Sequence, residues 1–403
     1  MKRNIYLMYA IAFQQGMVFY GPVATLYRQA QGVSVFQITL IESISLILCI
    51  LLEVVWGVIA DKIGYKKTMI FCCVLYFLSK IIFWQASGFA GFLAERVLLS
   101  VVISGMSGVD TSILYLSCKG EDSQKVFGVY NSLGMAGLLA AAAVFSVFVR
   151  DDYRLLGLLT VISYGMAAVL SLALTDVSPE GSRRISRKGF RQVLSQTMCD
   201  RNLLLFLVGA AFLNETHQTV TVFLNQLQYE KCGLGNAAIG FIYIGATLLG
   251  MCGPVSAWFT KRAGIRAAGT VFGGAAVLSC LTLAVSGSAL PSACGILALR
   301  VSNSLFQPFQ AEMQNRQVRT EYRATALSIH AMLLDGIGAG TNLVFGALAE
   351  RNLAGAFLFG AGICAVGTGL FLKWCRNRPC YSQSHQKYHT SDPSSPAASS
   401  DSL

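Results

Sequence analysis

The chain has 403 residues, of which 54% are hydrophobic and only 13% are charged. Soluble domains carry about 25% charged residues, so most of this chain cannot face water. The net charge of +11 would be compatible with nucleic-acid binding, but the placement of the basic residues argues against it. Membrane-spanning helices need about 20 apolar residues each. Runs of that kind recur throughout, which predicts an all-α polytopic membrane protein.

Twelve apolar runs, bounded by charged or Gly/Pro-rich turns, follow one another along the sequence. They lie at 4–26, 36–60, 67–86, 89–117, 126–149, 154–174, 203–228, 236–260, 266–287, 290–313, 324–349 and 354–375. The first run begins directly after Lys2-Arg3 and holds Gln14, Gln15 and Pro22. It is longer than the apolar core of a signal peptide, so we expect a retained first helix.

Basic residues gather on one side of these runs. If the chain changes side at each run, 23 of its 31 Lys and Arg residues lie on one side, five lie on the other and three lie within runs. Basic loops mark the cytoplasmic side. We therefore expect both termini in the cytoplasm and contact with anionic lipid rather than nucleic acid. The short loops favour the plasma membrane of a bacterium.

The longest interior loop, 175–202, separates the first six runs from the last six. Apolar residues recur there at helical spacing beside basic ones, which is typical of a short helix on an anionic membrane surface. A flexible charged linker is the alternative interpretation. Beyond Ser382 the composition predicts disorder. We predict an N-terminal six-helix bundle at 1–174, a C-terminal bundle at 203–376 and a cytoplasmic tail at 377–403.

The two sets of six runs also repeat in sequence. A basic turn at Gly57–Lys67 has a weaker copy at Lys261–Arg266, so that Gly64 corresponds to Gly264. Leu93-Ala-Glu-Arg96-Val97 in the fourth run likewise matches Leu297-Ala-Leu-Arg300-Val301 in the tenth. Parallel halves related by an axis along the membrane normal are a known transporter plan.

The turn after the second run resembles a loop motif of the major facilitator superfamily, Gly-x-x-x-Asp-Arg/Lys-x-Gly-Arg/Lys-Arg/Lys. The matching residues are Gly57, Asp61, Lys62, Gly64 and Lys66; Tyr65 replaces a basic residue and Lys67 adds one. Arg96 matches an Arg that the family often carries in its fourth helix. The resemblance covers about residues 4–376.

This resemblance implies two pseudo-symmetric six-helix bundles around a central cavity that opens to each side in turn, often with proton coupling. It also implies that Asp61 acts in a conformational switch, by interacting with the start of the eleventh helix near residues 323–325. The partial positive charge of that helix start would attract a carboxylate. One departure is the fifth run, which keeps small residues but lacks the Pro that drug/proton antiporters usually carry there.

Ionisable residues inside membrane spans are costly and commonly functional. The candidates for proton coupling are, in order of preference, Glu215, Asp335 and Asp110, followed by Glu42 and His217. A carboxyl group in the middle of the seventh run suits reversible protonation, and His217 beside it has a side chain that titrates near neutral pH. Structural ion pairs and a hydrogen-bonded kink are the alternative interpretations.

Amide side chains form stripes at helical spacing in the seventh and tenth runs, and such stripes should face a cavity rather than lipid. Arg96 is expected to pair with Glu95 or Glu42, and to share a helix face with Asp110. The candidate cavity residues are Gln14, Gln15, Arg96, Asn214, Gln218, Asn225, Arg300, Asn303, Gln307 and Gln310.

We interpret the chain as a secondary active transporter of a small organic solute, proton-coupled, with efflux favoured over uptake of a sugar or other metabolite. The amide-rich walls indicate a neutral, cationic or sugar-like substrate. A non-transporting sensor on the same scaffold is a further alternative. Twelve scattered Cys residues without a Cys/His cluster predict neither disulfides nor a metal site. We expect no cofactor, no enzymatic activity and a monomer.

Overall fold

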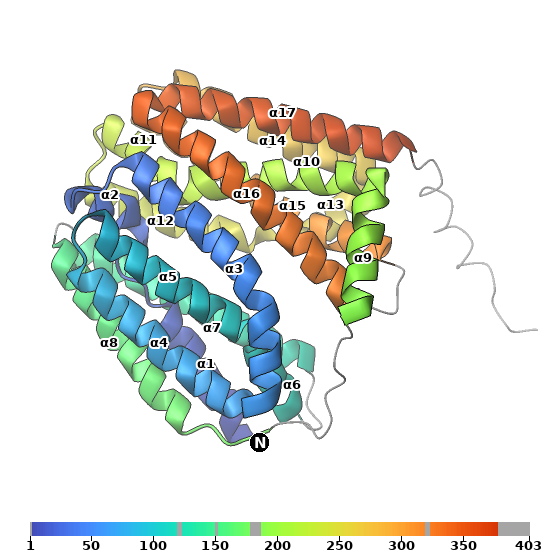
Figure 1. The fold of residues 1–403 in the computed structure, drawn as a ribbon. Coiled ribbons are helices and arrows are strands. Elements are labelled where there is room, and N and C mark those ends of the chain that lie inside the picture. The colour runs from blue at the N-terminus through green and yellow to red at the C-terminus, as the bar shows by residue number, and fades with distance from the viewer. Residues whose placement is uncertain (1, 119–122, 150–151, 178–186, 319–322, 378–403) are drawn as a thin grey trace, which may run out of the picture.

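The computed structural model describes residues 2–118, 123–149, 152–177, 187–318 and 323–377. The side chains at 53–55, 57–58, 60–62, 123–124, 187–192 and 323–325 lie outside this description. The described residues form helices and no strand, arranged in two groups that Figure 1 shows joined through α9. We call α1–α8 the N-terminal half and α10–α17 the C-terminal half.

The N-terminal half contains the first six predicted runs. Its elements are α1 (Lys2–Gly16), the 3-10 turn η1 (Gly21–Val23), α2 (Ala24–Ala30), α3 (Val35–Ile63), α4 (Tyr65–Gln85), α5 (Gly88–Met106), α6 (Val109–Ser117), α7 (Ser123–Val144), the π-helical turn η2 (Phe145–Val149) and α8 (Tyr153–Leu172). The linker contains α9 (Arg187–Cys199).

The C-terminal half contains the last six predicted runs. Its elements are α10 (Arg201–Gln218), the π-helical turn η3 (Thr219–Leu224), α11 (Asn225–Lys231), α12 (Asn236–Leu249), the 3-10 turn η4 (Gly250–Cys252), α13 (Val255–Ala263), α14 (Ile265–Val285), α15 (Ala289–Gln317), α16 (Arg323–Arg351) and α17 (Leu353–Asn377).

The helices of the described chain lie where the runs were predicted and are consistent with twelve spans. Nine stretches of the described chain are long and apolar enough to cross a membrane, and α12 to α13, bent by 55°, makes a tenth. The remaining two runs are interrupted helices: α1 continues through η1 into α2, and α10 passes through η3 into α11. The chain is therefore an all-α polytopic membrane protein.

The fourth predicted run, 89–117, is broken where a single helix was expected. Gly108 has a φ of +81°, a left-handed conformation that glycine adopts without steric cost. α5 therefore ends at Met106 and α6 begins at Val109. The helical repeat that would place Asp110 on the same face as Arg96 does not run through this break.

The internal repeat extends to backbone conformation. Gly64, between α3 and α4, has φ 87° and ψ 152°, and Gly264, between α13 and α14, has φ 84° and ψ 159°. A positive φ of this size strongly favours glycine. The two glycines that matched in the sequence thus make the same sharp turn between consecutive helices of each half.

Small residues in α7 allow it to approach α1 closely. A Cβ built at Gly137 would lie 2.2 Å from the Phe13 carbonyl oxygen, and one at Gly16 would lie 2.1 Å from the Gly134 carbonyl oxygen. Both neighbours are backbone atoms, so neither can move aside by rotating a side chain. The small residues of the fifth run therefore serve helix packing, as small residues commonly do in membrane proteins.

We expect Gly137→Ala to destabilise the fold by about 1–3 kcal/mol through overpacking against α1. Gly128→Ala is the matched control, because Gly128 lies on the same helix and an added Cβ there meets nothing within 4 Å. The control makes the same Gly-to-Ala change within the same helix but introduces no clash. Melting temperatures of the two purified variants in one detergent test this; equal temperatures would contradict it.

Hydrogen bonds join the two halves at the end of the molecule that bears α2 and the start of α3. The Thr25 amide donates to Gln226 Oε1 at 2.7 Å, and the Phe36 amide donates to Glu350 Oε2 at 2.9 Å. We call this the closed end. Figure 1 shows the ribbons of the two halves separating toward the opposite end, where α6 and α9 lie.

The linker helix α9 packs against the C-terminal half. Val193 forms a small apolar cluster with Ala326 and Ile329 of α16, while Leu194 and Met198 are exposed. The predicted cytoplasmic tail, 377–403, lies outside the described residues except for Asn377.

Candidate functional site

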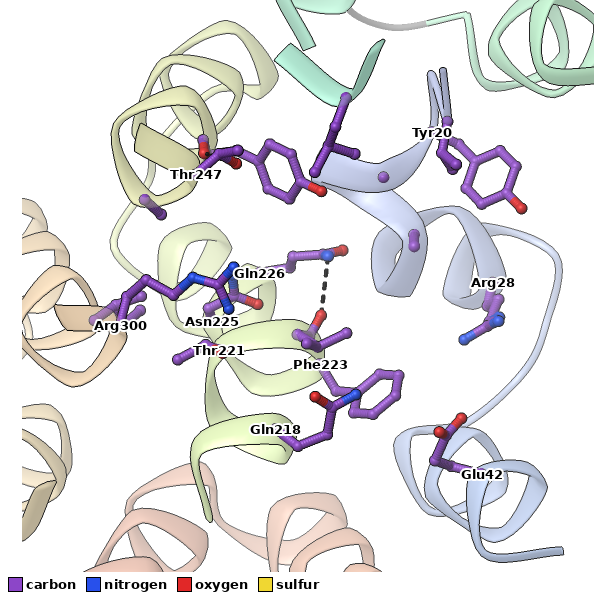
Figure 2. A pocket seen from close by; sticks show the side chains of 18 of the residues that line it. Tyr20, Arg28, Glu42, Gln218, Thr221, Phe223, Asn225, Gln226, Thr247 and Arg300 are labelled. Carbon is purple, nitrogen blue, oxygen red and sulfur yellow. Dashed lines mark hydrogen bonds between the residues drawn. The ribbon is translucent and has the colours of Figure 1, made fainter. Parts of the chain in front are cut away.

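A cavity of about 290 Å³ lies between the two halves. The N-terminal half lines it from η1, α2, α3, α4, α5 and α7, and the C-terminal half from α10, η3, α11, α12 and α15. Its volume is at the lower end of the range for sites that enclose small organic molecules. Figure 2 shows side chains from both halves directed into this space.

The wall of the cavity combines apolar, aromatic and charged side chains. The apolar and aromatic lining residues include Leu99, Phe223, Tyr229, Tyr243 and Ile296. The charged lining residues are Arg28, Glu42, Lys80, Glu95, Arg96 and Arg300.

Four of these charges form two ion pairs within the N-terminal half. Lys80 Nζ of α4 lies 3.6 Å from Glu95 Oε1 of α5 and donates to the Tyr20 hydroxyl at 3.1 Å. Arg96 of α5 donates to Glu42 of α3 at 2.5 Å. Arg96 thus pairs with Glu42, one of the two partners that the sequence allowed, and Glu95 pairs with Lys80 instead.

The other two charged residues, Arg28 and Arg300, have no hydrogen-bond or ion-pair partner for their side chains among the described residues. Arg28 is 8% exposed and its guanidinium lies 5.6 Å from the centre of the Phe83 ring. Arg300 lies on α15, where its guanidinium is close to Gly250 of η4. The two arginines come from opposite halves.

Glu215 lies at a junction of three helices. The residue is 8% exposed, and a Cβ built at Gly338 of α16 would lie 2.6 Å from Glu215 Oε2 and 3.6 Å from Leu46 of α3. The Thr219 hydroxyl lies 2.9 Å from Glu215 Oε1 and 2.8 Å from Asn342 Oδ1. Gly338 of α16 therefore lies close to Glu215 of its own half and to Leu46 of the other half, which places Glu215 near the contact between the halves.

Two of the other proton-coupling candidates, Glu42 and Asp335, lie within electrostatic range of Glu215. His217 points elsewhere: it is buried, and its ring lies 6.3 Å from the Phe306 ring. Asp110 lies on α6, where Asp110 Oδ2 accepts a 3.4 Å hydrogen bond from the Tyr130 hydroxyl. Neither His217 nor Asp110 lines the cavity.

Of the ten candidate cavity residues, Arg96, Gln218, Asn225 and Arg300 line the cavity. The two first-helix amides instead contact their own half: Gln14 Oε1 accepts from Ser163 at 2.6 Å, and Gln15 Nε2 lies 3.6 Å from Cys73 Sγ.

The remaining four candidates join α10 to α15 or extend along α15. Asn214 Nδ2 donates to Gln310 Oε1 at 2.8 Å, which satisfies one amide with another. Gln307 Nε2 lies 3.5 Å from Asn303 Oδ1, and Gln307 is exposed. None of the four lines the cavity.

The predicted switch motif lies at the end of α3 and the start of α4. Gly57, Asp61 and Lys62 belong to α3, but their side chains lie outside the described residues, as do those of 323–325. Gly64 forms the turn, Lys66 is half-buried and Lys67 is exposed. The interaction of Asp61 with the start of α16 stays a prediction.

Sequence reasoning missed Arg28, Lys80 and Tyr243 as cavity residues. Arg28 follows the first predicted run and is one of only five basic residues on the sparsely charged side. Lys80 is one of the three basic residues within predicted runs. The sequence could have identified both residues as candidates, because a cation in or beside a membrane span needs a partner or a function.

Two helical halves that enclose one polar cavity and meet at one end have the architecture of a membrane carrier. The sequence matches the family described as Major Facilitator Superfamily over residues 5–341, and the chain belongs to that family.

Solved transporter structures share the fold. The nucleoside transporter NupG matches with a TM-score of 0.80 at 15% identity, covering 93% of this chain and 100% of that one. A POT family transporter in complex with 5-aminolevulinic acid matches with a TM-score of 0.73 at 14% identity, covering 93% and 96%. A bacterial homologue of the human lysosomal transporter Spinster, inward-facing and unoccupied, gives 0.69 at 15% identity, covering 93% and 96%. No curated protein matches the sequence.

Proposed function

We propose that this protein is a secondary active carrier that moves a small organic solute across the plasma membrane by alternating access, coupled to protons. The observation that carries the proposal is the cavity between the halves, lined by charged and polar residues of both. A site shared by two bundles can be exposed to either side of the membrane when the bundles rock about it.

The contacts between the halves support this mechanism. Among the described residues, hydrogen bonds with backbone amides, such as Thr25 to Gln226 and Phe36 to Glu350, join the halves at the closed end. Bonds of this kind contribute about 1 kcal/mol each and can break and re-form. If the basic side faces the cytoplasm, the closed end faces outward.

Flux across proteoliposomes tests the proposal. Purified protein is reconstituted and loaded with a mixture of labelled solutes, and efflux is followed with and without an imposed pH gradient. We expect movement of at least one solute that depends on the protein, on the gradient and on the absence of an uncoupler. Flux that is equal in protein-free vesicles would contradict carrier function.

We propose Glu215 as the residue that takes up and releases the proton. Thr219 and Asn342 are its hydrogen-bond partners in both protonation states. The single proton of the Thr219 hydroxyl can point to Glu215 Oε1 or to Asn342 Oδ1, because Thr219 Oγ1 lies within 2.9 Å of both oxygens. When Glu215 is ionised, Thr219 donates to it. When Glu215 is protonated, its hydroxyl donates to Thr219, which then donates to Asn342. The same three residues thus satisfy both protonation states.

The orientation of the Asn342 amide fits this exchange. Asn342 Nδ2 is buried without a partner in the present orientation. Amide oxygen and nitrogen can exchange places by rotation of the terminal group. In the flipped orientation Nδ2 would donate to Thr219 while Thr219 donates to the ionised Glu215. Each protonation state of Glu215 therefore has one amide orientation of Asn342 that completes the chain.

The switch motif gives a separate prediction. We expect Asp61→Asn to lower the transport rate about tenfold, without weakening solute binding, because it removes the charge proposed to attract the N-terminus of α16. Initial rates and binding affinities of the variant, compared with Arg316→Gln as an exposed control outside the motif, test this. Wild-type transport by Asp61→Asn would exclude the role.

We propose export as the direction and uptake of a metabolite as the alternative. The loop motif supports the alternating mechanism in either case. Net accumulation in inverted membrane vesicles would support export, whereas accumulation in right-side-out vesicles would support uptake.

A further inference from the structure

The charges that line the cavity do not balance. Its four cations and two carboxylates leave an excess of two positive charges, because the carboxylates Glu42 and Glu95 are each paired with a cation. The excess resides in Arg28 and Arg300, which have no such partner among the described residues. Arginine stays protonated in proteins, so this excess persists at any physiological pH.

Arg28 is the more deeply placed of the two. It is more than nine-tenths buried, and its Nε atom meets no hydrogen-bond acceptor. The rings of Phe83 and Phe92 lie 5.6 Å and 6.0 Å from its guanidinium, which stabilises the cation only in part. An uncompensated charge at this depth is costly. A group that supplies the missing acceptor would recover much of that cost.

Arg300 occupies the opposite wall. Figure 2 shows Arg28 and Arg300 on opposite sides of the cavity, with their guanidinium groups directed inward and Phe223 and Gln226 between them. Asn225, beside Arg300 in this view, is buried and its Oδ1 atom also lacks a partner. One unpaired guanidinium from each half thus faces the same space.

We propose that the substrate is a small organic anion whose acidic group is bound by Arg28 and Arg300. This proposal rests on the carrier function proposed above and names its substrate class. The planar guanidinium fork matches the oxygens of a carboxylate or a phosphoryl group. The aromatic wall formed by Phe223, Tyr229 and Tyr243 offers contact for an apolar body, and a volume of about 290 Å³ limits the ligand to a small molecule.

This substrate class differs from the neutral, cationic or sugar-like solute that the amide stripes favoured. Two of those amides, Asn214 and Gln310, are hydrogen-bonded to each other and do not line the cavity. A cationic solute would meet two unpaired arginines, and like charges in a poorly solvated site repel strongly. An anion would also stabilise the approach of the two halves, because it would bind one arginine from each half.

Binding measurements with matched pairs of probes test the proposal. The probes are benzoate with benzamide, nicotinate with nicotinamide, succinate with succinamide, and phenyl phosphate with inorganic phosphate. The purified wild-type protein is compared with Arg28→Gln and Arg300→Gln, and with Arg28→Lys in case the uncharged variant fails to fold. Arg316→Gln is the control, since Arg316 forms an exposed ion pair with Glu312 away from the cavity.

We expect at least one anion to bind while its amide does not. The affinity for that anion should be about tenfold or more weaker in Arg28→Gln and Arg300→Gln and unchanged in Arg316→Gln.

Binding of carboxylates identifies a carboxylate carrier, and binding of phenyl phosphate alone identifies an organic phosphate carrier; both support the proposal. Binding of amides in preference to anions, anion binding that survives loss of both arginines, or no binding by any probe would overturn it. Anion binding without flux would leave this inference standing and remove the carrier function instead.

Discussion

Replacing Glu215 by Gln is expected to abolish the response of transport to a pH gradient while leaving solute exchange at equal pH largely intact. Glutamine has the shape of a protonated glutamic acid but cannot exchange a proton. Its side-chain amide can still donate to Thr219, which lies 2.9 Å from Glu215 Oε1. The variant therefore mimics the protonated state permanently. It loses only the exchange between the protonated and ionised states.

The site of Glu215 explains why a large effect is expected from a conservative change. Its carboxyl group lies against Gly338 of α16 and near Leu46 of α3, where the two halves meet. A change of charge at this position alters the contact between halves, which is the contact that must change during transport.

Asp110→Asn is the matched control for this experiment. Asp110 is also a carboxylate within a predicted span, but it lies on α6 and contacts Tyr130 of α7, so its contact stays within the N-terminal half. We expect its variant to keep the wild-type response to the gradient. A gradient response that persists in Glu215→Gln and disappears in Asp335→Asn would transfer the proton-coupling role to Asp335.

Long apolar runs predicted the helices well, because membrane-spanning length is encoded locally. The second run was placed at 36–60 and α3 spans Val35–Ile63; the ninth was placed at 266–287 and α14 spans Ile265–Val285. The break at Gly108 was not predicted, because glycine within an apolar run is common and only the backbone conformation decides whether the helix continues.

The charged wall of the cavity was harder to predict than the helices. Arg28 follows the first span in sequence, and the turn η1 with α2 folds it back between Phe83 and Phe92, more than 50 positions away. Glu95 and Arg96 are adjacent in sequence, but successive residues on a helix point about 100° apart. They therefore meet Lys80 and Glu42 respectively, on two different helices.

The amide stripes show why polarity alone was a poor guide to the cavity. Helical spacing correctly placed Gln218 and Asn225 on a cavity-facing surface. The same spacing could not distinguish them from Asn214, which donates to Gln310 at 2.8 Å across a helix–helix contact. An amide in a span needs a partner, and either a cavity or another amide can provide it.

The pair formed by Lys80 and Glu95 is expected to hold the N-terminal half together rather than to bind solute. Lys80 Nζ donates to the Tyr20 hydroxyl and lies 5.1 Å and 5.3 Å from the centres of the Tyr76 and Tyr164 rings. Glu95 is 1% exposed, and its Oε2 atom has no partner. This cluster ties α4 to α5 and α8 and to the residue before η1.

Lys80→Met is expected to destabilise the protein by about 3–5 kcal/mol, because it leaves the buried Glu95 carboxylate without its cation. Lys80→Met combined with Glu95→Gln should recover most of that loss, since no buried charge then remains unpaired. Melting temperatures in detergent measure both effects, with Arg316→Gln as an exposed-pair control that should cost less than about 1 kcal/mol.

If Lys80→Met keeps the wild-type melting temperature but loses anion binding, Lys80 belongs with Arg28 and Arg300 in the substrate site. Equal destabilisation of the single and double variants would instead show that the tyrosine contacts, not the charge pair, give Lys80 its structural role.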